Sequence, residues 1–432
     1  MPSNPRHDAA SGPIPAPSRA ELLAVFGRIG LLSFGGPAAQ IALMHRELVE
    51  RRPWLDERTF LNALSFCMLL PGPEAMQLAT YAGWKLRGTW GGIAAGLLFV
   101  VPGALVIFAL AAAYALLGDL PLIAALFLGV KATVVIVVIE ALLRVARKAL
   151  KGATGWALAA LSFVGIFALH LPFPLIIALA AAWGAWHAVP APGDHTAAPL
   201  RPRTLRTLVI WLALWAAPVL GLVALNQPLL LDIAAFFSKL AVVTFGGAYA
   251  VLAYMTQEVV ADQGWLTTAQ MMDALGLAET TPGPLILVTQ FVGFMAGYGQ
   301  GGLPLAFVAG LVTLWVTFVP CFLWIFAGAP YLDWIASRPR LTGALSAITA
   351  AVVGVIANLS IWFAVHVFFT TVGTARLGPA SIVWPDLATL NLPAVALALA
   401  AAVLLLRLHW NLPGVLGLMA LGGAGLWAVG IA

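Results

Sequence analysis

The chain has 432 residues, of which 62% are hydrophobic and only 9% are charged. Soluble domains carry about 25% charged residues, so this composition excludes a soluble protein and predicts an all-α polytopic membrane protein. The net charge of +5 does not indicate a nucleic-acid partner, because the basic residues lie between apolar segments. The two cysteines, Cys67 and Cys321, form no CxxC motif, which argues against redox chemistry and structural zinc.

Residues 1–18 are rich in proline, serine and alanine, and we expect a disordered cytosolic tail there. A polar linker, 190–206, divides the rest into an N-terminal transporter repeat, 19–189, and a C-terminal one, 207–432. A crossing helix needs about 20 mostly apolar residues. Up to 13 segments approach this length: 20–44, 59–84, 89–118, 121–143, 153–170, 172–189, 205–225, 230–255, 268–298, 301–329, 341–369, 390–406 and 411–431. The last two extend the second repeat.

One sequence pattern occurs twice, 211 residues apart. Phe34-Gly35-Gly36 begins a stretch that ends at Pro71-Gly72-Pro73, and Phe245-Gly246-Gly247 begins another that ends at Pro282-Gly283-Pro284. Of the 40 ungapped positions, 15 are identical. Glycine and proline at matching places in two halves are typical of a transporter site built from broken helices.

The basic loops set the expected orientation. With a cytosolic N-terminus and one crossing per segment, the basic loops fall on the cytosolic side except loop 45–58, which carries four arginines. If the broken segments are instead re-entrant hairpins, loop 45–58 becomes cytosolic and loop 256–263 faces outside. We favour the hairpins slightly, because re-entrant backbone is tolerated where protein buries it. Both arrangements predict inverted repeats, related by a pseudo-two-fold axis in the membrane plane. Kinks in ordinary spanning helices are the alternative, but they do not explain why the breaks recur.

The breaks themselves predict an anion site. Proline cannot continue a helix but fits the first turn of a new one, so each Pro-Gly-Pro should end one half-helix and begin another. Such a start offers free backbone N–H groups and the positive end of the helix dipole. The Gly35-Gly36 and Gly246-Gly247 pairs repeat this device one segment earlier, where glycine lets the backbone approach a ligand. We therefore expect four half-helix starts to converge on one anion.

Two cations lie at equivalent places ahead of these breaks. Arg28 and Lys239 each stand six residues before the phenylalanine of the FGG motif, within an apolar segment. Charges at membrane depth are costly and normally face a cavity or a partner. Snorkelling to the headgroups or pairing with a carboxylate is the alternative, but recurrence in both halves favours coordination of an anion.

One acid flanks the Pro-Gly-Pro break in each half, Glu74 after the first and Glu279 before the second. A carboxylate beside an anion site repels the substrate unless it is protonated, so both acids are candidates for proton coupling. Capping of a half-helix, or pairing with one of the two cations, is an equally acceptable role. Glu140 and Arg144 form an i,i+4 pair that we expect to be structural. Neutral donors near the breaks are Gln77, Thr280, Thr281 and Gln290.

Several motifs are absent from the sequence. It contains no G-x-x-x-x-G-K-[ST] loop, so ATP is not expected to drive transport within this chain. No Ser/His/Asp, HExxH or clustered-cysteine pattern indicates an enzyme, a metal site or a cofactor. The residues alone predict a secondary transporter for a small oxyanion.

The paired FGG…WL…PGP repeats, with Arg28 ahead of the first and the sequence LPGPE at the first break, resemble the long-chain, two-domain chromate ion transporter family of bacteria. The resemblance covers about 20–150 and 230–370. It implies a multi-pass inner-membrane carrier that expels chromate from the cytosol using the proton-motive force. Sulfate is a close structural analogue, and a homodimer is compatible with this assignment. The second break has leucine where the first has Glu74, which sets a limit to the equivalence of the repeats.

Two alternatives use the same scaffold. A sulfate or oxyanion importer differs only in coupling and direction, which the sequence does not show. An anion channel would use the same converging helix starts without an alternating gate. Chromate and sulfate are both tetrahedral dianions of similar size, and the spacing of the motifs does not separate them.

Overall fold

The computed structural model describes residues 17–118, 120–188, 202–245, 247–336, 338–377 and 380–431. Most of the predicted tail and of the predicted linker lies outside these residues, and residues 202–206 already belong to a helix. Among the described residues, five helical stretches are long and apolar enough to cross a membrane: 74–117, 121–149, 203–224, 285–331 and 339–368. The prediction of an all-α polytopic membrane protein is confirmed.

The helices of the first half follow the predicted segments, except that the breaks divide them into shorter pieces. Ser18 and Asp56 cap two of these helices by accepting hydrogen bonds from backbone N–H groups. A π-helical turn, Arg46–Arg51, continues the second helix. The helices are α1 (Arg19–Leu32), α2 (Gly36–His45), α3 (Glu57–Cys67), α4 (Glu74–Leu117), α5 (Pro121–Ala149), α6 (Gly152–Phe167) and α7 (Phe173–Trp186).

The second half repeats this order of elements. It contains α8 (Pro202–Ala224), α9 (Pro228–Val243), α10 (Ala248–Gln257), α11 (Thr268–Thr280), α12 (Val288–Gly328), α13 (Leu332–Ala336), α14 (Pro339–Phe368), α15 (Leu392–Ala402) and α16 (Leu412–Ala428). A π-helical turn, Glu258–Asp262, follows α10 as its counterpart follows α2. An antiparallel hairpin of β1 (Val372–Leu377) and β2 (Ala380–Pro385), which the sequence did not predict, connects α14 to α15.

The helices α4 and α12 each fold back on themselves near their beginning. The backbone leaves the helical region at Gly88 and Gly302, where φ is 65° and 63°, values that glycine adopts readily. The two arms of α4 touch, since a Cβ at Gly83 would lie 2.2 Å from the Gly91 carbonyl oxygen. The arm before each turn is therefore a half-helix. Like α3 with its 11 residues, or about 17 Å, it is too short to cross a bilayer core of about 30 Å.

The ends of the half-helices of one repeat lie together. Arg87 Nε, at the turn of α4, donates to the Pro17 carbonyl oxygen just before α1 at 2.6 Å. The pKa of Glu21, in the first turn of α1, is lowered by its hydrogen bonds with Ser18 and by the nearby charges of Arg52 and Arg87. The start of α1, the loop after α2 and the turn of α4 thus share one end of the molecule. In the second half, Asp232, Trp265 and Gln300 occupy the corresponding places and line one cavity of about 460 Å³.

The long arms of α4 and α12 pack against each other in opposite directions. A Cβ at Gly92 would lie 2.6 Å from the Phe326 ring, and one at Gly96 would lie 2.6 Å from the Phe322 ring. Further along, a Cβ at Gly310 would lie 2.6 Å from the Phe108 ring. As the residue number rises along α4, the number of the residue that it contacts on α12 falls. This antiparallel packing is the arrangement that inverted repeats require.

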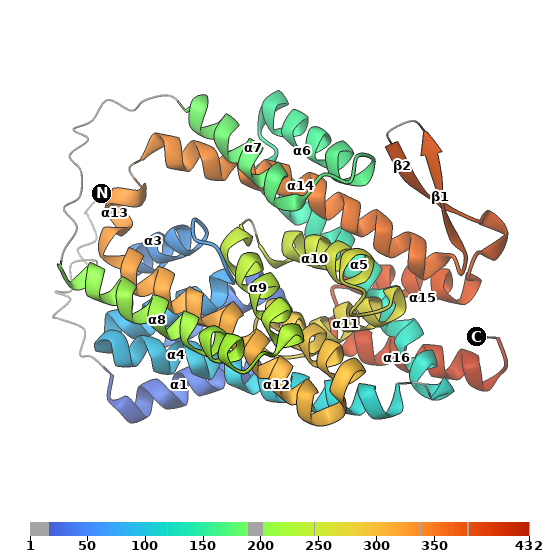
Figure 1. Cartoon of the computed structure of the whole chain (residues 1–432), viewed down its shortest axis with the longest axis horizontal. Coiled ribbons are helices and arrows are strands. Elements are labelled where there is room, and N and C mark those ends of the chain that lie inside the picture. Colours follow the sequence, from blue (N-terminus) through green and yellow to red (C-terminus); the bar gives the residue numbers. More distant parts are fainter. Residues whose placement is uncertain are drawn as a thin grey trace, which may run out of the picture.

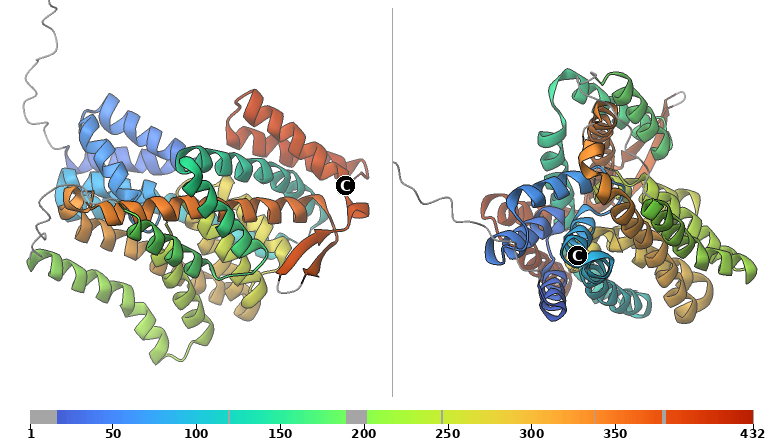
Figure 2. Two further views of the ribbon diagram at one scale, coloured as in Figure 1. Left: turned by 90° about the horizontal axis from the view of Figure 1, so that it is seen from above. Right: turned by 90° about the vertical axis from the view of Figure 1, so that its left-hand side faces the viewer.

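The last two helices of each half pack on the long helix of the other half. The α6–α7 pair covers α14, and the α15–α16 pair covers α5 (Figure 1). A Cβ at Gly354 would lie 2.1 Å from the Ala159 carbonyl oxygen, and one at Gly129 would lie 1.8 Å from that of Met419. The helices without a counterpart are thus α8, which lies at the edge of the molecule (Figure 2), and the five-residue α13, rather than the last two segments.

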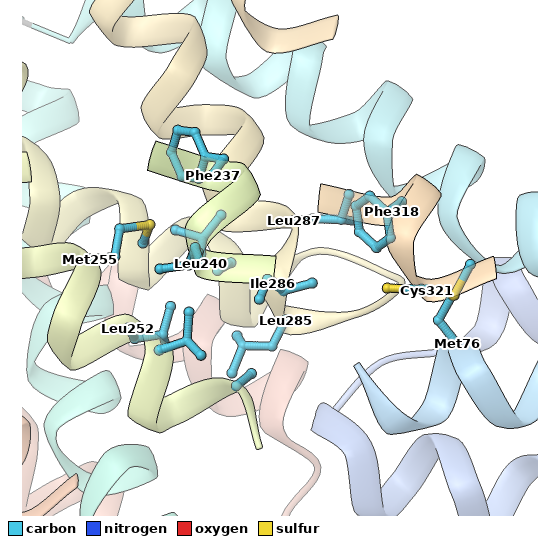
Figure 3. Packing of buried hydrophobic residues seen from close by; sticks show 14 of the residues in the cluster. Met76, Phe237, Leu240, Leu252, Met255, Leu285, Ile286, Leu287, Phe318 and Cys321 are labelled. Atoms are coloured by element: carbon cyan, nitrogen blue, oxygen red, sulfur yellow. The ribbon is translucent and has the colours of Figure 1, made fainter. Parts of the chain in front are cut away.

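The core is built around the second break. Leu285, Ile286 and Leu287 follow Pro284 and are buried. Leu285 and Ile286 lie near Leu240 of α9 and Leu252 of α10, whereas Leu287 lies beside Phe318 of α12 (Figure 3). On the other side of this loop, Met76 of α4 lies beside Cys321 of α12 (Figure 3). Residues of both halves therefore enclose the broken segments, which gives them the protein surroundings that irregular backbone needs at membrane depth.

The close approach of α4 to the second break gives a stability prediction. A Cβ at Gly103 would lie 2.1 Å from the carbonyl oxygen of Pro282, which is backbone and cannot move aside freely. Gly103→Ala is expected to destabilise the protein by about 1–3 kcal/mol, as overpacking does. Its melting temperature in detergent should fall measurably. Gly417→Ala is the control, because nothing lies within 4 Å of that position and alanine favours helix. Equal melting temperatures for the two variants would contradict a close contact between Gly103 and Pro282.

Candidate functional site

The two predicted breaks are joined reciprocally. The Gly72 N–H donates to the Thr244 carbonyl oxygen at 2.9 Å, and the Gly283 N–H donates to the Ser33 carbonyl oxygen at 2.8 Å. Ser33 and Thr244 directly precede the two FGG motifs. Each Pro-Gly-Pro break is therefore bonded to the glycine turn of the other half, and all four motifs meet in one region.

These bonds correct part of the sequence-based site. Gly72 and Gly283 adopt φ of 116° and 90°, which explains why glycine stands between the prolines. Their N–H groups, however, are used by carbonyl oxygens and are not free for an anion in this conformation. The hydroxyls of Thr280 and Thr281 are also committed, since they donate to the carbonyl oxygens of Leu277 and Ala278 at 2.8 and 3.1 Å.

Buried glutamine side chains donate hydrogen bonds to backbone carbonyl oxygens at and beside the breaks. Gln77 Nε2 donates to the Pro71 carbonyl oxygen at 2.6 Å, and Gln290 Nε2 donates to that of Ala104 at 2.9 Å. Gln40, which is not among the predicted site residues, donates to the Gly283 carbonyl oxygen at 2.6 Å. It thereby ties α2 to the break of the other half. Its polarity within an apolar stretch, just after the FGG motif, was the available signal.

A large cavity lies between the first glycine turn and α5. Its volume is about 1260 Å³. Residues of the glycine turn line one side, and the C-terminal part of α5 lines the other. Side chains of α10, α11 and the α15–α16 connection complete it. The polar and turn residues of the lining are Gly35, Gly36, Glu140, Arg144, Arg147, Lys148, Tyr249, Glu279, His409 and Asn411.

Three cations of α5 reach this cavity. Arg144 forms the predicted i,i+4 pair with Glu140, with an Nη2–Oε1 distance of 2.5 Å, so that prediction is confirmed. Lys148 Nζ lies 3.5 Å from the sulfur of Met68, just ahead of the first Pro-Gly-Pro. Arg147 is exposed on the same stretch of helix. In the sequence, Arg147 and Lys148 stand in the basic stretch that follows the predicted segment 121–143, and no local pattern there indicates their place beside the glycine turn.

Glu279 is buried at the edge of the same cavity. The Tyr249 hydroxyl donates to Glu279 Oε1 at 2.9 Å. Its partner is thus a tyrosine of α10 rather than Arg28 or Lys239. Glu74, the acid of the first break, is the first residue of α4 and does not line the cavity. The structure therefore separates the two acids that the sequence treated alike.

The two cations predicted to hold the anion lie elsewhere. Arg28 is exposed on α1, and Lys239 Nζ lies 5.3 Å above the ring of Tyr254, a cation–π distance. Neither lines the cavity in this conformation. Gly246 lies outside the described residues, and Gly247 lies at the start of α10. Among the described residues, no group of three or more His, Cys, Asp or Glu side chains is arranged to hold a metal ion.

His45 links the end of α2 to the start of α3 and gives a pH prediction. Its hydrogen bond to Glu57, and then that to Glu50, raise its pKa above the usual 6.5. The stabilisation is therefore fully present below about pH 6.5 and is lost as the pH rises through the higher folded-state pKa. The side chains are partly exposed, so the effect should be below about 1 kcal/mol. His45→Gln should flatten the melting temperature between about pH 6 and 8; an unchanged pH profile would contradict this.

Comparison with known proteins identifies similar chains over both halves. A family model described as "Chromate transporter" matches residues 20–185 and 231–426. A "Chromate transport protein" of Pseudomonas aeruginosa is 33% identical over 362 residues, which is 82% of this chain and 83% of that protein. A protein of the same description from Cupriavidus metallidurans is 31% identical, over 78% of this chain and 80% of its own.

A shorter relative matches only part of the chain. The "Uncharacterized transporter YwrB" of Bacillus subtilis is 32% identical over 170 residues, which is 39% of this chain but 86% of that protein. A chain of about half the length is thus similar to one part of this one. No solved structure matches.

Proposed function

Because the chain belongs to the chromate transporter family, we propose that it exports chromate across the inner membrane, driven by the proton-motive force. The observation that carries this proposal is the cavity in which Arg144, Arg147 and Lys148 face the Gly35-Gly36 turn. Cationic side chains and a helix start together attract a small dianion. A tetrahedral oxyanion such as sulfate fits the same description.

We place the anion between the glycine turn and the α5 cations. The reciprocal bonds of Gly72 and Gly283 hold the turn in position, so the two prolines and the glycine of each break act as its support. The sequence-based hypothesis instead gives Arg28 and Lys239 the role of ligands, and the two sets of residues can be tested against each other. Both halves of the site come from one chain, so we propose the single chain as the transport unit; a homodimer is compatible with this.

The uneven charge of the two halves supports export. The counterparts on α14 of Arg144, Arg147 and Lys148 are Trp362, Val365 and His366, counted from the prolines that begin the two helices. The cations therefore occur on one half only. By the positive-inside rule, the end of α5 that carries them faces the cytosol. The anion is attracted on the cytosolic side and meets weaker attraction where it leaves.

The membrane arrangement that follows has re-entrant half-helices and a cytosolic N-terminus. It predicts that loop 45–58 and loop 256–263 lie on opposite sides of the membrane. A cysteine in place of Glu50 and one in place of Asp262 should react with an impermeant thiol reagent from opposite sides, in a background without the two buried native cysteines. Labelling of both from one side would contradict inverted repeats.

Flux into inverted membrane vesicles tests the function itself. Radiolabelled chromate and sulfate should accumulate when a pH gradient is imposed and should stop accumulating when it is collapsed. Uptake in the opposite direction would indicate an importer. Passive equilibration that ignores the gradient would indicate a channel.

A further inference from the structure

The molecule contains a buried ion pair that the proposed anion site does not use. Lys131 Nζ of α5 lies 3.1 Å from Asp273 Oδ1 of α11. The Tyr114 hydroxyl of α4 donates to Asp273 Oδ2 at 2.8 Å. Asp273 is 7% exposed. The carboxylate of Asp273 is therefore bound by side chains of both α5 and α4, and the ion pair fixes α11 against α5.

This contact separates two hollow regions. On one side is the cavity of the proposed anion site, lined by Glu279 at the end of α11. On the other is a cavity of about 510 Å³, lined by Lys131, by residues of the first turns of α11 such as Thr268, and by His366. Between them a Cβ at Gly276 would lie 2.7 Å from Val130 Cγ1, so the two helices touch directly. The α5–α11 contact therefore lies between the residues of these two helices that line the one cavity and those that line the other.

The corresponding contact of the other half is open. The counterpart of α11 is α3, and that of α5 is α14. Among the described residues, α3 and α14 make no contact comparable to that of α11 with α5. Asn62 and Ser65, the counterparts of Asp273 and Gly276, are exposed. The first cavity lies between α2 and α5, whereas their counterparts α10 and α14 pack together.

We propose that the α5–α11 contact is a closed gate, and that transport exchanges it for a contact of α3 with α14. In a transporter with inverted repeats, the two halves exchange conformations when the site changes from facing one side of the membrane to facing the other. The differences between the halves in the conformation described above therefore define the second conformation. The exchanged contact brings Asn62 towards Thr349, the counterpart of Lys131. The ion pair thus exists in one state only and favours the conformation described above. This inference rests on the proposed transporter function.

A pair of cysteines tests the gate directly. A Cβ at Gly276 would lie 3.8 Å from Val130 Cβ, the mean separation in disulfides. In a background without Cys67 and Cys321, oxidised Val130→Cys/Gly276→Cys should form the bond and stop transport. Reduction of the disulfide should restore transport. The equivalent pair, Ser65→Cys/Ile348→Cys, should also form a bond in the membrane, but only in molecules whose first gate is open. Full transport by the oxidised first pair, or failure of the second pair to form, would overturn the proposal.

The ion pair can be tested separately. Lys131→Met/Asp273→Asn, combined with the second cysteine pair, should increase its rate of bond formation roughly tenfold, because the state held by the ion pair loses its advantage. The exchanged variant, Lys131→Asp/Asp273→Lys, keeps opposite charges and should return the rate towards that of the parent. Equal rates in all three would overturn the role of the pair. These bonds are detected by gel mobility without any substrate, so a failure of chromate transport alone leaves the test of the gate intact.

Discussion

Replacing Arg147 and Lys148 together by alanine is expected to raise the chromate concentration for half-maximal transport about 10- to 100-fold. Such a change corresponds to roughly 1.4–2.8 kcal/mol of lost anion binding. Both side chains line the cavity beside the Gly35-Gly36 turn, and hydrogen bonds to charged groups are the strong ones. Initial rates of chromate flux in vesicles, corrected for the amount of protein in the membrane, measure the effect. The difference between the variant and the parent should become smaller at high salt, which screens the attraction between the cations and the anion.

Arg28→Ala and Lys239→Ala are the matched comparison, because each also removes one cation from an apolar segment. The position of the cavity predicts that they change the half-maximal concentration much less than the α5 double variant does. The sequence-based hypothesis predicts the reverse, with loss of transport in both alanine variants and impairment even in Arg28→Lys, which loses the bidentate guanidinium. A severe defect in Arg28→Ala, with a normal α5 double variant, would move the anion site to α1 and α9.

Glu279→Gln is expected to abolish the dependence of transport on the pH gradient while anion binding survives. Glu279 is buried, bonded to Tyr249 and adjacent to the cavity, so a proton taken up there removes a negative charge next to the anion. Intramembrane acids of this kind often serve as proton relays. The amide keeps the shape and can still accept the tyrosine hydrogen bond, but it cannot ionise. The ratio of flux with and without the gradient should fall to about one.

Glu74→Gln is the control for this experiment. Glu74 flanks the other break and does not line the cavity, so its amide variant should keep the response to the gradient. Chromate binding to purified Glu279→Gln, measured by calorimetry, separates loss of coupling from loss of the site. If Glu279→Gln responds to the gradient like the parent, Glu279 is a structural partner of Tyr249. Loss of protein from the membrane would support that structural role as well.

The sequence by itself determined the membrane class, the repeated FGG and PGP motifs and the places where helices break. These features depend on local chemistry: apolar length, the missing N–H of proline and the backbone freedom of glycine act within a few residues. The same reasoning identified Glu140 and Arg144 as a pair, since an i,i+4 spacing fixes their contact. It did not predict the β1–β2 hairpin, nor that α8 is a helix without a counterpart in the first half.

Only the tertiary structure decided which of the predicted residues meet. The direction of a side chain on an apolar helix depends on what packs against each face, and Arg28 and Lys239 lie on faces of α1 and α9 that do not line the cavity. The Gly72 and Gly283 N–H groups found carbonyl partners more than 170 residues away, which no local pattern encodes. The cations beside the glycine turn came from α5, because the turn of one helix and the end of another converge only in the folded chain.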